Sequence, residues 1–411
     1  MCVSRIRFLN LGMAFGLFVG SGCASHVEQG TSDAGVITGG GVAANAGGQS
    51  GSTPSGGSTA GGSGAAIGGT LKDYLGDPSY PDTFWQTATF ADSNIDPAPF
   101  QQALARIASN GWEVHSFLVA RNGRIVFERY GWKSGTNLDD PDTTPHQVVP
   151  SERHLVWSVT KSFTSALVGA AIADGLIDGV DHKVADWFAD YASLNPTADK
   201  SSITLADLLT MRSGLQFTEG ESAVFDTPDP GRTMLARDVT DTPVGTVWNY
   251  STGGVDIVAD ILRIATGMTP LDYGKAKLFS PIGIVDPPWA AAQSGTNHGG
   301  FGLSLTAREM ARFGELYRNY GTWGSQQVLP ADWTTTSTSS KCTTAWYMDY
   351  GYLWFLPYVS DFFVAIGMYG QEIFVSRSKG LVIVFTADLP ASEANSDYVS
   401  LINDFVIPAV K

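Results

Sequence analysis

The stretch LVWSVTKSF, residues 155–163, decides how the rest of this 411-residue chain is interpreted. It predicts the start of a helix that runs to about Asp174 and carries apolar side chains on one face. Ser158 and Lys161 are three residues apart, so they share the other face of that helix. A serine hydroxyl is a weak nucleophile, and a lysine one turn away is close enough to accept its proton. Burial and the positive end of the helix dipole would favour the uncharged form of that lysine.

The beginning of the same helix also suits an oxyanion. The backbone N–H of Ser158 is free to bond a developing negative charge, because the first N–H groups of a helix have no partner within it. A Ser-x-x-Lys pattern by itself also fits a polar helix face turned to solvent. The apolar character of the remaining helix favours a central position in the fold.

Strand-like runs lie at both ends of the globular part, and the middle, about residues 180–310, is mainly helical. The tetrapeptide RNGR, residues 121–124, predicts a hairpin turn. Helices are expected over 96–109 and 392–406. This order predicts the α+β class, with an antiparallel sheet flanked by helices and an inserted mainly helical region. The expected strands are Val114–Ala120, Ile125–Tyr130, Phe362–Ile366, Glu372–Ser376 and Leu381–Ala387.

The N-terminus has the layout of an export signal. A short basic start is followed by an apolar stretch from Phe8 to Val19, which is too short to span a bilayer comfortably. Residues 1–22 are therefore predicted to be a signal peptide. The residues before Cys23 resemble a bacterial lipobox, although Gly20 stands where leucine is usual. We expect lipidation at Cys23 and anchoring at the bacterial cell envelope, in the periplasm or on the outer surface; plain secretion and a retained anchor are the alternatives.

Residues 23–71 are expected to form a flexible tether. Residues 30–70 contain 15 glycines and one charged residue, Asp33. Such a segment cannot bury enough apolar surface to offset its ordering entropy. The globular domain is accordingly placed at residues 72–411.

Charge and cysteine content exclude several classes of function. The formal net charge is −15 at pH 7, which disfavours a nucleic-acid partner because phosphate binding requires clustered lysine and arginine. With Cys2 in the signal segment and Cys23 at the lipidation site, Cys342 is left without an intrachain partner. No Cys-x-x-Cys pair is present, so a structural zinc site is not expected. We also expect no other metal and no cofactor.

Several motifs occur in an order that resembles the serine β-lactamase and penicillin-binding protein superfamily. More specifically, they are similar to its branch of class C β-lactamases, esterases and 6-aminohexanoate-dimer hydrolases. The resemblance covers roughly residues 80–411 and implies a β-lactamase/transpeptidase-like fold. One of these stretches has Arg212 near the position where histidine is usual. The motifs are LVWSVTKSF (155–163) with GLI (175–177), ITLADLLTMRSGL (203–215), WNYSTGG (248–254) and GGFGLSLTAREMARF (299–313).

The resemblance assigns roles to two further boxes. It implies that Tyr250 shares the base role with Lys161 and later protonates the leaving group. Thr252 replaces the usual asparagine of that box, so any substrate contact at this position is altered. Phe217 and Glu219 follow the structural stretch, where a pocket-lining role and a plain loop role are both open.

The third box departs most from the family pattern. Its usual Lys-Thr-Gly aligns with Ala365-Ile366-Gly367, and the next residue, Met368, is expected to supply the second oxyanion N–H. Gly367 would let the substrate backbone approach closely. The strand is expected to continue through residues 369–371. The missing cation argues against substrates that carry a carboxylate, such as β-lactams and peptidoglycan stems.

The sequence therefore predicts a metal-free serine hydrolase that acts on a small-molecule ester or amide. A cell-wall peptidase or β-lactamase is the first alternative, and a non-catalytic surface binding module is the second. The six histidines, His298 among them, receive no catalytic role. No Gly-x-Ser-x-Gly elbow lies between a strand and a helix, so an α/β-hydrolase triad is not expected.

Overall fold

The computed structural model describes most of the globular part of the chain. The predicted signal peptide, Cys23 and nearly all of the predicted tether lie outside the described residues. Within the described part, no helix is both long enough and apolar enough to cross a membrane. The described residues are 71–73, 75, 85–137, 139–140, 142–346, 348–357, 361–390 and 394–411.

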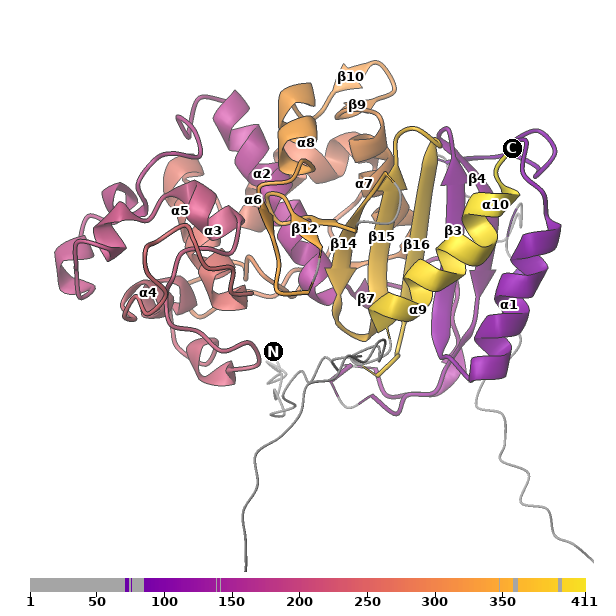
Figure 1. The fold of residues 1–411 in the computed structure, drawn as a ribbon, viewed down its shortest axis with the longest axis horizontal. Coiled ribbons are helices and arrows are strands. Elements are labelled where there is room, and N and C mark those ends of the chain that lie inside the picture. Colours follow the sequence, from indigo (N-terminus) through magenta and orange to yellow (C-terminus); the bar gives the residue numbers. More distant parts are fainter. Residues whose placement is uncertain are drawn as a thin grey trace, which may run out of the picture. The chain divides into compact units, whose positions relative to one another are not determined.

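A large sheet organises this domain (Figure 1). Its strands follow the order β1-β4-β3-β16-β15-β14-β13-β12-β11, with β2 beside β4. All pairs are antiparallel except β2 with β4, which is parallel. The strands are β1 (Lys72–Asp73), β2 (Gln86–Thr87), β3 (Val114–Arg121), β4 (Arg124–Tyr130), β11 (Cys342–Thr343), β12 (Asp349–Tyr350), β13 (Phe355–Leu356), β14 (Phe362–Gly367), β15 (Gln371–Ser376) and β16 (Leu381–Ala387).

The predicted hairpin is confirmed at the Asn-Gly turn. Asn122 and Gly123 both have positive φ, at 49° and 78°, which is the conformation that a two-residue hairpin turn requires. β3 and β4 pair on either side of this turn, with Arg121 opposite Arg124. The N-terminal hairpin then pairs with β16, so that the two ends of the domain form one sheet.

Helices cover both faces of the sheet. The C-terminal segment and α1 (Ala98–Asn110) pack on one face, where Phe100, Phe117 and Phe127 lie within 6.3 Å of one another. The predicted final helix is in fact three pieces, α9 (Ala394–Leu401), a π turn (Ile402–Val406) and α10 (Ile407–Ala409). The other face packs on α2 (Thr160–Ala173) and α7 (Ala307–Arg318), which contribute to the main core.

The mainly helical region predicted between these segments is confirmed, and it lies to the left of the sheet in Figure 1. Local signals define its helices: Ser251 caps α5 by accepting a hydrogen bond from the N–H of Gly254, and Gly267 ends that helix with φ of 69°. Its helices are α3 (Leu205–Leu209), α4 (Pro230–Leu235), α5 (Thr252–Thr266) and α6 (Pro270–Gly274), and α8 (Ala331–Ser337) follows α7. Short two-stranded pairs join β5 (Trp132–Lys133) to β6 (His146–Gln147), β7 (His154–Leu155) to β8 (Ser304–Leu305), and β9 (Thr322–Trp323) to β10 (Gln326–Gln327).

One buried acid in the sheet makes stability depend on pH. Glu372 of β15 is fully buried, and neither of its carboxyl oxygens has a hydrogen-bond partner among the described residues. Burial raises the pKa of Glu372 well above its ordinary value of 4.5, because desolvation disfavours the charged carboxylate. Its contribution to stability is therefore fully present below pH 4.5 and is lost as the pH rises above that value.

Glu372→Gln is accordingly expected to raise the melting temperature by a few degrees at about pH 8. At that pH the wild type must take up a proton or bury a charged carboxylate when it folds, whereas glutamine is neutral at every pH. The difference from the wild type should shrink towards about pH 4, where the wild-type carboxyl is protonated in both states. Thermal unfolding followed by circular dichroism at the two pH values measures this. A difference of equal size at both values would contradict the assignment.

Candidate active site

Ser158 lies at a strained junction between a strand and a helix. β7 ends at Leu155, and the chain enters the short 3₁₀ turn η1 (Trp157–Val159) directly before α2. Trp157 has φ of 48°, an uncommon conformation for a residue other than glycine. The Val156 N–H donates to the Leu303 carbonyl, which ties this junction to the segment before β8. Ser158 remains partly exposed while its neighbours on both sides are buried.

Lys161 lies one turn further along and is almost completely buried, with 2% of its surface exposed. Its Nζ donates to Ser158 Oγ at 2.8 Å, to Thr252 Oγ1 at 2.9 Å and to the Gly300 carbonyl at 2.9 Å. Burial lowers the pKa of Lys161 to about 8, although nearby acidic groups oppose the shift. The amine is therefore much more readily deprotonated than an exposed lysine.

α2 differs from the expectation of one apolar and one polar face, because residues 160–171 are buried on all sides. Its polar side chains instead bond to other segments. Ser162 Oγ donates to the Leu353 carbonyl and Thr164 Oγ1 donates to the Gly299 carbonyl, both at 2.7 Å. Protein carbonyls therefore satisfy the hydroxyls of Ser162 and Thr164 inside the core.

Tyr250 faces Lys161 from the segment that leads into α5. The Lys161 Nζ lies 4.9 Å from the centroid of the Tyr250 ring. Burial raises the pKa of the Tyr250 phenol well above 10, while an interaction with Ser158 works in the opposite direction. The phenol is therefore neutral near pH 7 and suits the role of a proton donor better than that of a base.

Thr252 and Glu219 complete the surroundings of the amine. Thr252 Oγ1 donates to Glu219 Oε1 at 2.6 Å, and the Thr252 backbone N–H donates to Glu219 Oε2 at 3.1 Å. Glu219 thus holds the first residue of α5 with both carboxylate oxygens. The sequence left Glu219 between a pocket-lining and a loop role, and the structure places it one hydroxyl away from Lys161.

The end of β14 lies against the segment that carries Ser158. A Cβ atom at Gly367 would lie 2.4 Å from the Val156 carbonyl oxygen, so only glycine fits this position without a shift of the backbone. Met368 follows directly and is partly exposed. Its expected oxyanion role stays a prediction, and Met368 lies directly after the glycine that contacts the segment before Ser158.

The expectation that the strand continues through residues 369–371 is wrong. β14 ends at Gly367, and residues 368–370 form a short turn in which Tyr369 has φ of 62°. The Tyr369 ring packs edge-on against Trp157, with centroids 5.5 Å apart, and its hydroxyl donates to Asp139. The aromatic contact favours a turn here, because it requires the Tyr369 side chain to face η1.

Two other residues considered from the sequence lie away from the amine. Phe217 is buried in the main core and packs against Phe225, so it supports the start of α5 from beneath. The Nδ1 of His298 lies 3.0 Å from an Asp256 carboxylate oxygen, and its ring stacks on Phe301 with centroids 4.3 Å apart. The backbone carbonyl of Gly300 was missed altogether, because no side-chain pattern marks a carbonyl that accepts from a distant lysine.

Aromatic rings form one wall of the site. Trp346 lies 5.3 Å from Tyr250 and 4.9 Å from Trp248, and Phe355 lies 6.1 Å from Tyr250, measured between ring centroids. Trp248 and Trp346 are both partly exposed. This aromatic wall comprises Trp248, Tyr250, Trp346 and Phe355.

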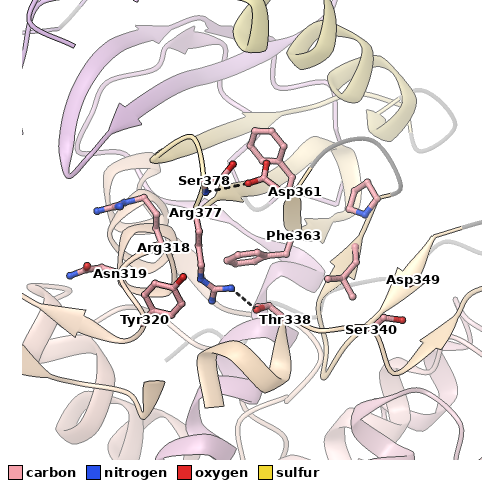
Figure 2. A pocket seen from close by; sticks show the side chains of 13 residues that line it. Arg318, Asn319, Tyr320, Thr338, Ser340, Asp349, Asp361, Phe363, Arg377 and Ser378 are labelled. Carbon is pink, nitrogen blue, oxygen red and sulfur yellow. Dashed lines mark hydrogen bonds between the residues drawn. The ribbon is translucent and has the colours of Figure 1, made fainter. Parts of the chain in front are cut away.

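A cavity of about 660 Å³ lies elsewhere, at the opposite end of β14 (Figure 2). That end, at Phe362, is about 17 Å along the strand from Gly367. Arg377 lies there between the rings of Tyr320 and Phe363, at 4.7 and 4.6 Å from their centroids. None of the predicted catalytic residues lines this cavity.

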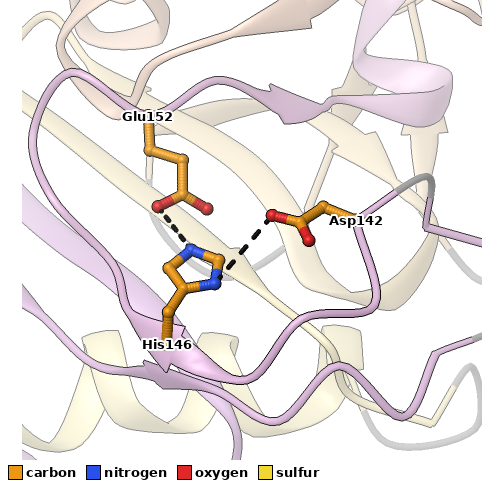
Figure 3. A group of neighbouring side chains, drawn as sticks. All are labelled: Asp142, His146 and Glu152. Carbon is orange, nitrogen blue, oxygen red and sulfur yellow. Dashed lines mark hydrogen bonds and ion pairs between the residues drawn. The ribbon is translucent and has the colours of Figure 1, made fainter.

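One group of side chains has the composition of a metal site (Figure 3). Asp142 and Glu152 lie on either side of His146, whose Nε2 is 2.9 Å from Glu152 Oε2. A hydrogen bond to the Thr144 carbonyl, together with Glu152, raises the pKa of His146. Its contacts with Glu152 and Asp142 hold the three side chains together.

The chain is similar to known proteins in sequence and in fold. A family model described as Beta-lactamase matches residues 104–400. The 6-aminohexanoate-dimer hydrolase of Paenarthrobacter ureafaciens is 24% identical over 304 residues, which cover 67% of this chain and 72% of that protein. A solved family VIII carboxylesterase gives a TM-score of 0.61 at 19% identity, covering 75% of this chain and 96% of the other. The class C β-lactamase from Rhodobacter sphaeroides gives 0.58 at 18% identity, covering 77% and 100%.

Proposed function

The chain belongs to the Beta-lactamase family, and from that premise we propose that it is a serine hydrolase acting on an ester or amide carbonyl through an acyl-enzyme on Ser158. The observation that carries the proposal is the 2.8 Å contact between Lys161 Nζ and Ser158 Oγ. The lowered pKa of Lys161, about 8, gives this amine an appreciable neutral fraction near neutral pH.

The proposed reaction has two halves. Ser158 Oγ attacks the carbonyl carbon while its proton passes to neutral Lys161. The backbone N–H groups of Ser158 and Met368 bond the oxyanion that forms. Tyr250 donates a proton to the leaving group and regains one from protonated Lys161, and the ester or amide bond breaks with the acyl group on Ser158. Water then attacks the acyl-enzyme and gives a proton to Lys161. That proton returns to Ser158 Oγ as the acid is released.

Two features support a substrate whose acyl group carries no charge. The position where the family resemblance expects a lysine is occupied by Ala365, which is 1% exposed and carries no charge. The aromatic wall beside Tyr250 presents apolar surface in its place. A carboxylate-bearing β-lactam or peptide would meet no cation at residue 365.

The proposed export and lipid anchor rest on the N-terminal sequence alone. Cys23 and the segment before it lie outside the described residues, so this remains a prediction. In this proposal the glycine-rich segment tethers the enzyme to the cell envelope.

A fluorophosphonate probe tests the proposed function directly. We expect the probe to modify Ser158, because only an activated serine attacks phosphorus readily. Peptide mass spectrometry locates the adduct, and competition with short esters, amides and a penicillin ranks the substrate classes. Protection by penicillin alone would favour the β-lactamase or peptidase alternative. A chain that remains unlabelled would favour the non-catalytic binding module.

A further inference from the structure

The three hydrogen-bond partners of the Lys161 amine determine where the lone pair of its neutral form can point. Ser158 Oγ, Thr252 Oγ1 and the Gly300 carbonyl all lie within 2.9 Å of Nζ. An ammonium has three N–H donors, so these partners fully satisfy the charged form. A neutral amine keeps two N–H groups and has one lone pair. Proton abstraction requires that the lone pair, and neither N–H group, face Ser158.

In two of its three contacts, the Lys161 amine has to donate a hydrogen bond. The Gly300 carbonyl only accepts hydrogen bonds, so Lys161 must continue to donate to it. The Thr252 hydroxyl could donate or accept, and its direction depends on Glu219. A carboxylate only accepts, so the 2.6 Å contact places the Thr252 hydroxyl proton on the Glu219 side. The lone pairs of Thr252 Oγ1 then face Lys161.

We infer that Glu219 is a positioning residue that acts through the Thr252 hydroxyl to direct the lone pair of neutral Lys161 towards Ser158. The inference rests on the proposed function and adds a residue to its machinery. Without the carboxylate, the Thr252 hydroxyl can turn and donate its proton to the amine. It would then compete with Ser158 for the base. Ser158 can still transfer its proton to Lys161, but only in the smaller fraction of molecules in which the lone pair of the amine faces Ser158.

Glu219 also acts through its charge. Burial lowers the pKa of Lys161 to about 8, and the negative charges of Glu219 and Asp256 limit that decrease. Removal of the Glu219 charge therefore lowers the pKa of the base further. Loss of Glu219 is therefore expected to have two effects. The lost positioning lowers kcat, and the lost charge moves the ascending limb of the pH profile to lower pH.

The test compares Glu219→Gln, Thr252→Val, their double variant and Thr252→Ser with the wild type. With p-nitrophenyl butyrate, Glu219→Gln and Thr252→Val are each expected to lower kcat on the order of 10- to 100-fold with little change in KM. Thr252→Ser keeps the hydroxyl and should stay near the wild type. The double variant should be no worse than the poorer single variant, because both changes remove one hydrogen-bonded unit.

The pH profile separates positioning from a structural effect. The ascending limb of kcat/KM should move below its wild-type midpoint in Glu219→Gln, and the pH dependence of fluorophosphonate labelling should shift with it. Glu221→Gln is the matched control: it removes a like charge from the same loop, where Glu221 pairs with Arg237, and should leave the midpoint unchanged.

Two results would overturn the inference while the proposed function stands. One is a Glu219→Gln variant, folded by its melting curve, with wild-type kcat and pH midpoint. The other is a double variant whose loss is the product of the single losses. Should Glu219→Gln not fold, the comparison of Thr252→Val with Thr252→Ser decides, and equal kcat in these two would refute the inference. Turnover that survives in Ser158→Ala would instead remove the proposed function and the inference together.

Discussion

Ser158→Ala is expected to lower kcat/KM for p-nitrophenyl butyrate by about 10⁴-fold or more, because the variant has no atom to form the acyl-enzyme. Ser158 is partly exposed just before α2, and loss of its hydroxyl removes one partner from the Lys161 amine and one from the Tyr250 phenol. We therefore expect the melting temperature to change by only a few degrees. Initial-rate kinetics and a melting curve check both expectations.

Ser165→Ala provides a matched control within the same helix. Ser165 is completely buried, and its hydroxyl has no hydrogen-bond partner among the described residues. Its removal should leave kcat/KM unchanged. If Ser165→Ala lost as much activity as Ser158→Ala, the loss would reflect damage to α2. If Ser158→Ala kept its activity, Ser158 would not be the nucleophile.

Lys161→Met is expected to lower kcat by about 10³-fold or more, because methionine has a similar length but no lone pair that can accept the Ser158 proton. The wild-type rate should rise with pH through a midpoint of about 8, since the amine works as a base only when it is deprotonated. The variant should lack this limb. Combining Lys161→Met with Ser158→Ala should cause no further loss, because the two residues act as one unit.

Lys200→Met is the control for removal of a buried lysine. Lys200 is fully buried, and its Nζ donates to the carbonyls of Leu194 and Asn195 in the helical region. The variant should be less stable but should keep its kcat and its pH midpoint. A Lys161→Met variant with a wild-type pH profile would show that another group is the base.

Much of the fold could be predicted because its signals are local. The Asn122-Gly123 turn requires positive φ at both residues, and alternating or continuous apolar runs marked β3, β4, β14, β15 and β16 to within a residue or two. The short strands β11 to β13 were not predicted. Each has two residues, and such strands depend on pairing with a neighbour more than on their own sequence.

Some parts of the candidate site could likewise be predicted from the sequence, and others could not. The spacing of Ser158 and Lys161 on one helix, and the box that contains Tyr250, could be found from the sequence. The Gly300 carbonyl, which accepts from Lys161 Nζ, and the carboxylate of Glu219, which accepts from Thr252, could not be assigned. They lie in loops 139 and 58 residues away from Lys161. The turn at Tyr369 was also missed, because its packing partner, Trp157, lies more than 200 residues earlier in the chain.

The sequence by itself determined the α+β class, which follows from the periodicity of single elements, and the family, which follows from the resemblance of its motifs. It also predicted a nucleophile, a base and a proton donor from the Ser-x-x-Lys spacing and that resemblance. Only the tertiary structure decided the protonation and direction of those groups. Burial of Lys161 lowers its pKa to about 8, and Thr252 and Gly300 occupy two of its three hydrogen-bonding directions. Both effects arise from desolvation and from contacts between distant segments, which a linear pattern does not contain.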